Sequence, residues 1–563
     1  ERSGKIKLRR SFKVENGHLV QIDSPEGIFR RTETGWEKLD ADSEIAAHRS
    51  RGIHAKEKSL PSILSLITKD QFEMITTDPE RPVIIQGSAG SGKTTVALHR
   101  LAWLLHENNS TVKSENTRVI VMNKSLAVYV SATLPSMGID DVQTTTFNSW
   151  ALSIIRKSMR TQPFFKFLTI PSFVEEIKFS EEILKALDGL VEKQGKALDE
   201  EIKKEFSSRT AHLEGWAKGK GKPILPRLRD FRHEVKNSKL PEAEKQQKLG
   251  FVKKQIANQE DYLQDLYNLL SDTEHLKKYL KRDTKLASNL EYLKRLTDKN
   301  RLKKNLDYFD MSLVLRFIQI KNGGLPDGDG GTVLLDHIVI DEAQDFGPVE
   351  FAIMMDAVRD KHQITIVGDV AQKILFARKF IGWKKVVEYL GLDEDSIIQL
   401  EVSFRCTVPI MTLAYKVAGD PKTVEGRAGP APDWKKVGNF VDLTEALADW
   451  SRGLLRADPY KLVALICRYP KQAMELKEEM ENYLPGEVRL GHRDQFSFEP
   501  GVLVTNIHQV KGLEFDSVAL VEPDEENYPE KREESRNMIY VGITRTQEDL
   551  LLATIRPYSS VLF

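Results

Sequence analysis

The sequence predicts an α/β protein built on parallel β-sheets, and two observations carry that prediction. Short apolar runs typical of buried strands recur along the 563-residue chain, separated by stretches with helical spacing. We expect such strands at residues 82–86, 118–122, 337–340, 364–367, 462–467, 502–505 and 518–521. The first of them leads through a glycine-rich turn into an amphipathic run at residues 94–106, which predicts a strand, a loop and a helix in succession.

Composition narrows the class of protein. Charged residues make up 29% of the chain and apolar residues 40%, which is typical of globular proteins and excludes global disorder. Lys plus Arg and Asp plus Glu both number 83, so a basic surface would have to come from local segregation of charge. The only cysteines, Cys406 and Cys467, exclude a disulfide framework and favour a reducing, cytoplasmic location. No uncharged apolar stretch approaches the ~20 residues that span a bilayer, so we expect no membrane partner.

The chain divides into several predicted regions. At roughly 150 residues per domain, its length predicts about three or four domains. Residues 1–60 alternate apolar and polar positions in short runs, which indicates a small N-terminal segment, β-rich or irregular. A helix is expected at residues 62–77. We assign residues 61–150 and 313–400 to a first α/β domain and residues 401–563 to a second.

A helical insertion interrupts the first domain at residues 151–312, where the β signal disappears and Lys, Glu, Leu and Gln recur at helical spacing. Residues 201–310 hold 26 Lys plus Arg against 17 Asp plus Glu, a surplus of 9 positive charges. Aromatic residues are scattered through the same stretch: Phe206, Trp216, Phe231, Phe251, Tyr262, Tyr267, Tyr279, Tyr292, Tyr308 and Phe309. The insertion is either an arm that docks nucleic acid or a protein, or a solvated helical bundle whose aromatic residues form its core.

A phosphate-binding loop follows the first predicted strand. The segment from Gly87 to Thr94 fits the eight-residue P-loop pattern between an apolar strand and a helix. Its backbone N–H groups would cradle phosphates, Lys93 would contact the β- and γ-phosphates, and the Thr94 hydroxyl would ligate Mg²⁺. The candidate nucleotide-binding residues here are Gly87, Ser88, Ala89, Gly90, Ser91, Gly92, Lys93, Thr94 and Thr95.

Two acidic residues end a second apolar strand. Asp341 and Glu342 follow residues 338–340, and the carboxyl edge of a parallel sheet is where nucleotides bind. Asp341 is expected to hold Mg²⁺ and Glu342 to polarise the attacking water. Together with the P-loop, they predict a nucleoside-triphosphate hydrolase.

Asp341-Glu342-Ala343-Gln344 with a P-loop resembles the superfamily 1 helicases of the UvrD/Rep type. Six further motifs follow in that family's order between residues 68 and 545. The resemblance implies that Gln71 contacts adenine, Glu514 the ribose and Gln372 the γ-phosphate. It implies that Arg405 and Arg545 stabilise the transition state, and that Thr146 and Asn148 contact nucleic acid.

The resemblance implies two RecA-like P-loop domains that hydrolyse ATP with Mg²⁺ in the cleft between them and move on single-stranded DNA. It implies Lys93, Glu342, Gln372, Arg405 and Arg545 as catalytic residues. Gly512 joins Glu514 in the motif around the nucleotide, and His508 and Lys511 of the same motif are candidate nucleic-acid contacts, as is Phe376.

Two departures from the UvrD/Rep pattern keep an alternative open. The aromatic residues that usually follow the γ-phosphate-sensing Gln fall here on Leu375 and Ala377, so base stacking worth ~1–3 kcal/mol per base is lost unless Phe376 substitutes. Only about 100 residues separate Arg405 from Thr505, too few for the large extra domain that UvrD and Rep carry.

Residues 96–100 and 123–138 look closer to HelD, a helicase-like factor that binds RNA polymerase. The sequence thus supports a DNA translocase or helicase, with a HelD-like ATPase that remodels or recycles RNA polymerase as the alternative. A non-hydrolysing scaffold is a third hypothesis, against which the intact Lys93, Asp341, Glu342, Gln372, Arg405 and Arg545 argue.

Overall fold

The computed structural model describes most of the chain. The described residues are 11–15, 18–24, 27–32, 35–38, 69–87, 91–159, 163–166, 168, 170–280, 284–303, 305–328, 330–369, 382–393, 396–400, 406–419, 421, 423–424, 427–492 and 496–563. Near the N-terminus, four strands form an antiparallel sheet in chain order: β1 (Ser11–Glu15), β2 (His18–Ser24), β3 (Gly27–Thr32) and β4 (Gly35–Lys38).

The first α/β domain is built on a six-stranded sheet whose described pairings are all parallel. Its strand order is β14 (Ile397–Leu400), β5 (Val83–Gly87), β13 (Ile364–Gly368), β12 (His337–Ile340), β6 (Thr117–Val121) and β7 (Gln143–Thr146). Alternate residues of the strands enter two separate cores: Ile338 and Ile340 face one, and Val339 faces the other. Both faces of this sheet are therefore covered, as a parallel sheet requires.

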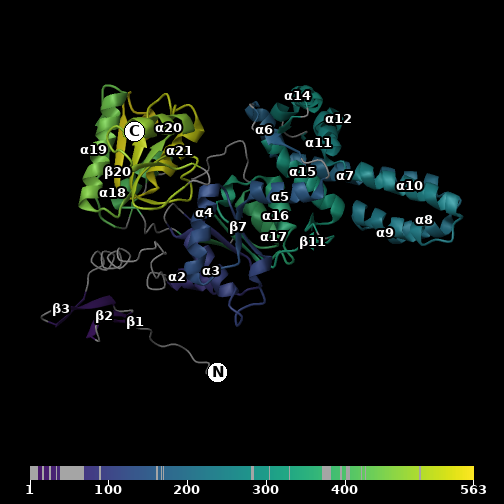
Figure 1. Ribbon diagram of the computed structural model, residues 1–563, viewed down its shortest axis with the longest axis horizontal. Coiled ribbons are helices and arrows are strands. Elements are labelled where there is room, and N and C mark those ends of the chain that lie inside the picture. Colours follow the sequence, from purple (N-terminus) through teal and green to yellow (C-terminus); the bar gives the residue numbers. More distant parts are fainter. Residues whose placement is uncertain are drawn as a thin grey trace.

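Helices pack on both faces of that sheet (Figure 1). They are α2 (Lys69–Ile75), α3 (Lys93–Leu104), α4 (Lys124–Thr133), α5 (Phe147–Ser158), α15 (Met311–Asn322), α16 (Pro348–Met355) and α17 (Trp383–Leu390). The helix that we predict at residues 62–77 is described from Lys69 to Ile75, and residues 62–68 lie outside the described part.

The second α/β domain has another six-stranded parallel sheet. Its order is β15 (Asp433–Lys436), β20 (Thr546–Thr554), β19 (Phe515–Val521), β16 (Leu462–Cys467), β18 (Gly501–Asn506) and β17 (Val488–Leu490). The helices of this domain are α18 (Val408–Ala418), α19 (Phe440–Ala457), α20 (Pro470–Met480) and α21 (Glu533–Ile543). The predicted fold class, α/β with two parallel sheets flanked by helices, is confirmed.

The insertion is helical and projects from the first domain (Figure 1). Its helices are α6 (Ser172–Lys178), α7 (Glu181–Glu205), α8 (Thr210–Lys218), α9 (Ile224–Lys236), α10 (Glu242–Gln259), α11 (Tyr262–Ser271), α12 (Thr273–Tyr279), α13 (Thr284–Ala287) and α14 (Leu290–Leu302). We call the projecting part, residues 196–259, the arm. Helix α7 joins the two parts, because Leu187 packs in the core of the first domain and Ile202 in a separate core inside the arm.

The aromatic residues of the arm lie mostly in that separate core. Phe206, Trp216 and Phe231 are buried there together with Leu228 and Val252. Edge-to-face contacts join Phe231 to both Phe206 and Trp216. These aromatic residues thus form the core of a helical bundle, which was one of the two interpretations of the sequence. Among the described residues, no helix is long and apolar enough to cross a bilayer.

Candidate active site

The phosphate-binding loop lies between β5 and α3, as its sequence predicts. A Cβ on Gly87 would come within 2.6 Å of the Ser91 Oγ and 2.8 Å of the Leu400 carbonyl oxygen, so only glycine fits at the end of β5. Gly92 adopts φ 82°, a left-handed conformation that glycine adopts without strain. The Lys93 Nζ donates to the Gly87 carbonyl at 2.9 Å and thereby closes the loop. Ser88, Ala89 and Gly90 lie outside the described residues.

A magnesium ion would find oxygen ligands beside this loop. The Thr94 hydroxyl donates to the Asp341 Oδ2 at 2.9 Å, which joins the start of α3 to the end of β12. Burial, reinforced by the neighbouring Glu342, raises the pKa of Asp341 to about 7. The Ser91 hydroxyl is buried and has no hydrogen-bond partner among the described residues, as expected of a group that faces a ligand. A hydroxyl and a carboxylate fit Mg²⁺, which prefers oxygen ligands.

Glu342 is held in an unusual conformation next to Asp341. Its φ of 54° places a residue with a side chain in the left-handed region, at a cost of about 1–3 kcal/mol. The side chain is buried and accepts a hydrogen bond from the Gln344 amide, whose oxygen in turn accepts from the Asp369 N–H at 2.8 Å. Burial alone would raise the pKa of Glu342, but Lys511, Lys93 and Arg545 outweigh it and lower that pKa. The carboxylate is therefore charged and oriented, as a general base must be.

Lys511 reaches this carboxylate from the second domain. Its ammonium forms an ion pair with Asp345 and lies 3.6 Å from the Glu342 Oε2. The Asn123 side chain donates to the Lys511 carbonyl at 3.1 Å, and the Ser125 hydroxyl donates to the Gln509 Oε1 at 2.9 Å. The segment after β18 is thereby docked against the N-terminus of α4 and the end of β12. Both domains contribute to one site.

Arg545 is buried in the second domain near the same carboxylate. Its guanidinium donates to the carbonyl oxygens of Val541 at 3.0 Å and Leu513 at 3.1 Å. Its charge contributes to the lowered pKa of Glu342. Glu514, the candidate ribose ligand, accepts a hydrogen bond from the Gln547 amide at 3.1 Å.

Gln71 lies beside the phosphate loop, whereas Gly512 packs against α4 of the first domain. The Gln71 amide donates to the Ser91 carbonyl at 3.4 Å, which places this candidate adenine ligand beside the phosphate loop. Gly512 has φ 81°, and a Cβ there would lie 2.7 Å from Leu126 of α4. Gln372, Arg405 and Phe376 lie outside the described residues.

The four described candidates for nucleic-acid contact differ in exposure. His508 is exposed, 3.2 Å from the Arg468 guanidinium, and Asn148 is half-buried at the start of α5. Thr146 is buried and caps α5, because its hydroxyl accepts from the Ser149 N–H at 3.2 Å. Lys511 is buried in the active site, so its amine is occupied there in this conformation.

Sequence reasoning missed four residues of the site. Gln344, Asp345 and Asp369 orient or pair the candidate catalytic groups, and Asn123 donates a hydrogen bond to the second domain. Gln344 lies in the quoted motif, Asp345 follows it directly and Asp369 lies three residues before Gln372, so their position was a signal. Asn123 begins the segment 123–138 that resembles HelD, but its contact could not be predicted, because the partner is 388 residues away.

The fold and the site together define a P-loop nucleoside-triphosphate-binding protein with two parallel α/β domains. Comparison with protein families finds the UvrD/REP helicase N-terminal domain at residues 67–378 and the UvrD-like helicase C-terminal domain at residues 460–557. Since the first match alone spans more than half of the chain, the chain belongs to the UvrD/Rep helicase family. Members of this family are ATP-hydrolysing enzymes that act on nucleic acid, generally with Mg²⁺.

Among solved structures, the chain is similar to the C-terminal domain of a possible DNA helicase from Lactobacillus plantarum WCFS1. The identity is 24%, the match covers 29% of this chain and 92% of that chain, and the TM-score is 0.25. No curated protein matches.

Proposed function

We propose that this protein is an ATP-dependent translocase or helicase that moves on single-stranded DNA. The observation that supports it best is the position of Lys511, which comes from the second domain and contacts the candidate base Glu342 in the first. Any relative movement of the domains changes the surroundings of that carboxylate, so hydrolysis and domain movement are coupled. The resemblance to UvrD and Rep favours 3′ to 5′ movement.

In the proposed mechanism, the described residues divide the work of phosphoryl transfer. Lys93 would bind the β- and γ-phosphates, and Thr94 and Asp341 would hold Mg²⁺, which would neutralise charge on the phosphate oxygens. Glu342 orients the attacking water and accepts its proton. Arg545, with Arg405, stabilises the charge that develops on the γ-phosphate.

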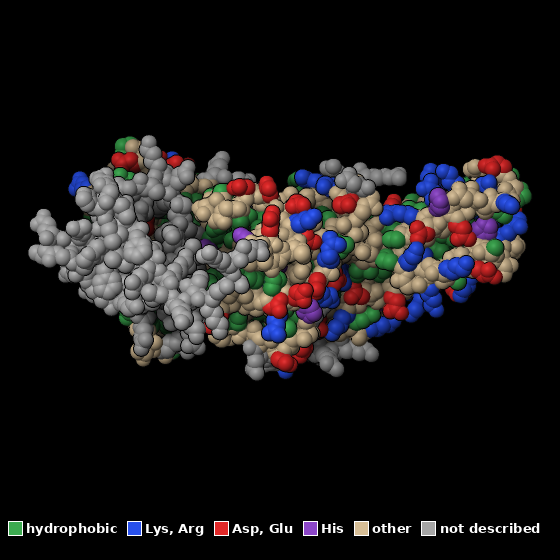
Figure 2. Space-filling view, turned by 90° about the horizontal axis from the view of Figure 1, so that it is seen from below, with side chains coloured by type: hydrophobic (Ala, Val, Ile, Leu, Met, Phe, Trp, Pro, Cys, Tyr) green, Lys and Arg blue, Asp and Glu red, His purple; other side chains and the backbone are tan. Residues whose placement is uncertain are grey.

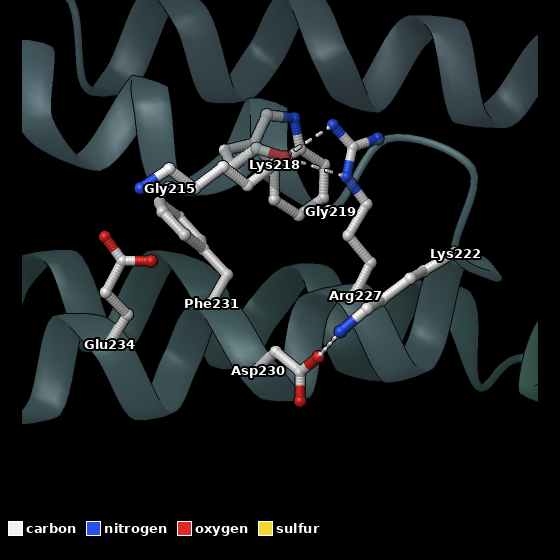
Figure 3. Close-up of a pocket in the computed structure, with 9 residues that line it drawn as sticks. Gly215, Lys218, Gly219, Lys222, Arg227, Asp230, Phe231 and Glu234 are labelled. Atoms are coloured by element: carbon white, nitrogen blue, oxygen red, sulfur yellow. Dashed lines mark hydrogen bonds and ion pairs between the residues drawn. The ribbon is translucent and has the colours of Figure 1, made fainter.

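The positive charge of the arm favours a polyanionic substrate. Lys218, Lys220 and Arg232 are exposed, and Figure 2 shows Lys and Arg side chains over this end of the molecule, interspersed with Asp and Glu. Other cations of the arm are used internally: the Arg227 guanidinium lies 3.6 Å from the centre of the Trp216 ring, and Lys222 pairs with Asp230 at 2.7 Å (Figure 3). Because the aromatic rings are buried, the arm would contact phosphates and not stack on bases.

A HelD-like ATPase that binds and remodels RNA polymerase is the second candidate. It is favoured by the lack of an extra domain in the second half of the chain: the described residues between Cys406 and Val502 form α18, β15, α19, β16, α20 and β17, which belong to the second α/β domain. The replacement of two stacking aromatics by Leu375 and Ala377 points in the same direction.

The decisive test is the steady-state ATPase rate with and without single-stranded DNA at about 50 mM salt, where phosphate contacts are least screened. A rise of roughly tenfold or more supports the translocase. A flat response with measurable basal turnover contradicts it and favours the second candidate, for which binding to purified RNA polymerase is then measured.

Glu342→Gln tests the assignment of the base. The variant should bind ATP with nearly unchanged affinity, since the amide keeps the shape of the side chain, but hydrolyse it at least about 100-fold more slowly. Single-turnover hydrolysis and nucleotide binding measure the two effects separately. Near-normal turnover would refute the role of Glu342 as the base.

Replacing Lys218, Lys220 and Arg232 together by Ala tests the arm as part of the DNA track. The plot of log K against log salt has a negative slope for phosphate contacts. Removing three such contacts should make that slope less steep by roughly 2 for single strands. The matched control replaces Lys435, Lys436 and Lys471, three exposed cations of the second domain, and should leave the slope unchanged. Equal slopes for both variants would show that the arm does not contact DNA.

A further inference from the structure

A single buried arginine ties the Gln71 helix to the phosphate-loop helix. Arg100 lies on α3, six residues beyond Thr94, and is fully buried. Its Nη1 donates to the carbonyl oxygens of Met74 at 3.3 Å, Ile75 at 3.4 Å and Thr77 at 2.7 Å, and its Nη2 to those of Asp78 and Arg81, both at 3.1 Å. All five acceptors lie in the segment that ends α2 and leads into β5.

This contact is well suited to fix α2. The helix spans only 7 residues, and so short a helix depends on tertiary contacts for its stability. A cation at its C-terminal end interacts favourably with the helix dipole and satisfies carbonyl groups that have no partner within the helix. Burial lowers the pKa of Arg100 to about 10, which leaves the guanidinium charged at neutral pH.

The position of α2 determines where the Gln71 amide lies. That amide donates to the Ser91 carbonyl at the long distance of 3.4 Å and lies 3.5 Å from the Cβ position of Gly92. A primary amide has one acceptor and two donor hydrogens, which match the amino group and N7 of adenine, whereas guanine presents two acceptors at the same edge. A shift of α2 relative to α3 would move this amide relative to the phosphates.

We propose that Arg100 is a positioning residue that holds Gln71 in register with the phosphate loop and thereby determines the preference for adenine over guanine. This inference rests on the proposed function and on the role that the resemblance to UvrD and Rep implies for Gln71, which is contact with the base of ATP. Arg100 itself contacts the end of α2 and the loop that leads into β5, and not the nucleotide.

The test compares the affinities for ADP and GDP, with Mg²⁺, by isothermal titration calorimetry. Arg100→Lys keeps the charge but replaces a planar fork of donors by one compact ammonium, so α2 loses its register. The ratio of ADP to GDP affinity should fall at least fivefold, toward the ratio of Gln71→Ala, and the double variant should show no further loss. Arg316→Lys, the same change at a buried arginine of α15, controls for loss of stability and should keep the wild-type ratio.

Three outcomes overturn the proposal. Equal losses of ADP and GDP affinity in Arg100→Lys would mean that the arginine only stabilises the domain. Additive losses in the double variant would mean that Arg100 acts independently of Gln71. Equal affinities of the wild-type protein for ADP and GDP would mean that the site does not distinguish adenine from guanine. ADP and GDP report binding and not hydrolysis. A protein that binds them as expected but does not hydrolyse ATP would therefore count against the proposed function alone.

Discussion

Among single residues, Lys511 is a buried cation of the second domain that contacts carboxylates of the first. A buried ammonium is stable only beside negative charge, and here its partners are the carboxylates of Asp345 and Glu342. The same ion pairs keep Glu342 charged in a site whose burial would otherwise favour the neutral acid. One side chain thus joins two domains and keeps the candidate base charged.

Lys511→Met should shift the pH dependence of ATP hydrolysis. In the proposed mechanism Glu342 acts as a base when deprotonated, so activity should be lost as the pH falls through its lowered pKa. Removing Lys511 raises that pKa, so the acid limb of the kcat/KM profile should move to higher pH. The profile is measured between pH 5 and 9 at saturating Mg²⁺. An unmoved acid limb would show that Lys511 does not set the charge of Glu342.

The residues of this site differ in how well the sequence predicts them. Lys93, Thr94 and Asp341 were predictable because each follows a buried strand at a fixed spacing, and the local chain alone positions it. The pairing of Lys511 with Asp345 was not predictable, because it joins residues 166 positions apart in two domains. The local pattern of residues 508–515 suggested instead that Lys511 contacts nucleic acid. That contact stays a prediction.

At the scale of elements, full burial explains why several strands were predicted, although the sequence prediction missed β20, in which Leu550, Leu551 and Leu552 are buried. β12, β13 and β16 are buried at every position and appear as continuous apolar runs, so all were predicted. β7 and β15 lie at sheet edges and read Gln-Thr-Thr-Thr and Asp-Trp-Lys-Lys, which carry no apolar run. Edge strands face solvent and need no apolar side chains, so composition alone does not reveal them.

The base of the insertion depends on a buried ion pair between α11 and α15. The Lys321 Nζ lies 2.6 Å from the Asp265 Oδ2, and both side chains are almost fully buried. Burial raises the pKa of Asp265 and lowers that of Lys321, so each charge is stable only with its partner.

Lys321→Met should therefore lower the free energy of unfolding by about 3–5 kcal/mol, because it leaves a buried carboxylate unpaired. Adding Asp265→Leu removes that carboxylate and should restore most of the loss. Denaturant unfolding of the wild type, both single variants and the double variant gives the coupling energy between them. A double variant no more stable than Lys321→Met would show that the pair is not what stabilises this junction.

At the scale of the whole molecule, the two α/β domains meet where residues 509–512 pack against α4. Gly512→Ala places a Cβ 2.7 Å from Leu126 and should hold the domains apart, lowering kcat at least about tenfold with little change in the stability of either domain. Gly138→Ala is the matched control: its φ is 78°, but a Cβ there would meet nothing within 4 Å. Equal kcat for the two variants would show that this contact does not limit hydrolysis.

The continuity of α7 has a mechanical consequence. This 25-residue helix is about 37 Å long at 1.5 Å per residue, and it runs from the core of the first domain into the core of the arm. A rod embedded in packed side chains at both ends transmits rotation with little bending. A turn of about 10° at its base, within the range of domain closures, carries the far end through roughly 6 Å. The arm thus acts as a lever: a small rotation of the first domain becomes a larger displacement at the far end of the arm.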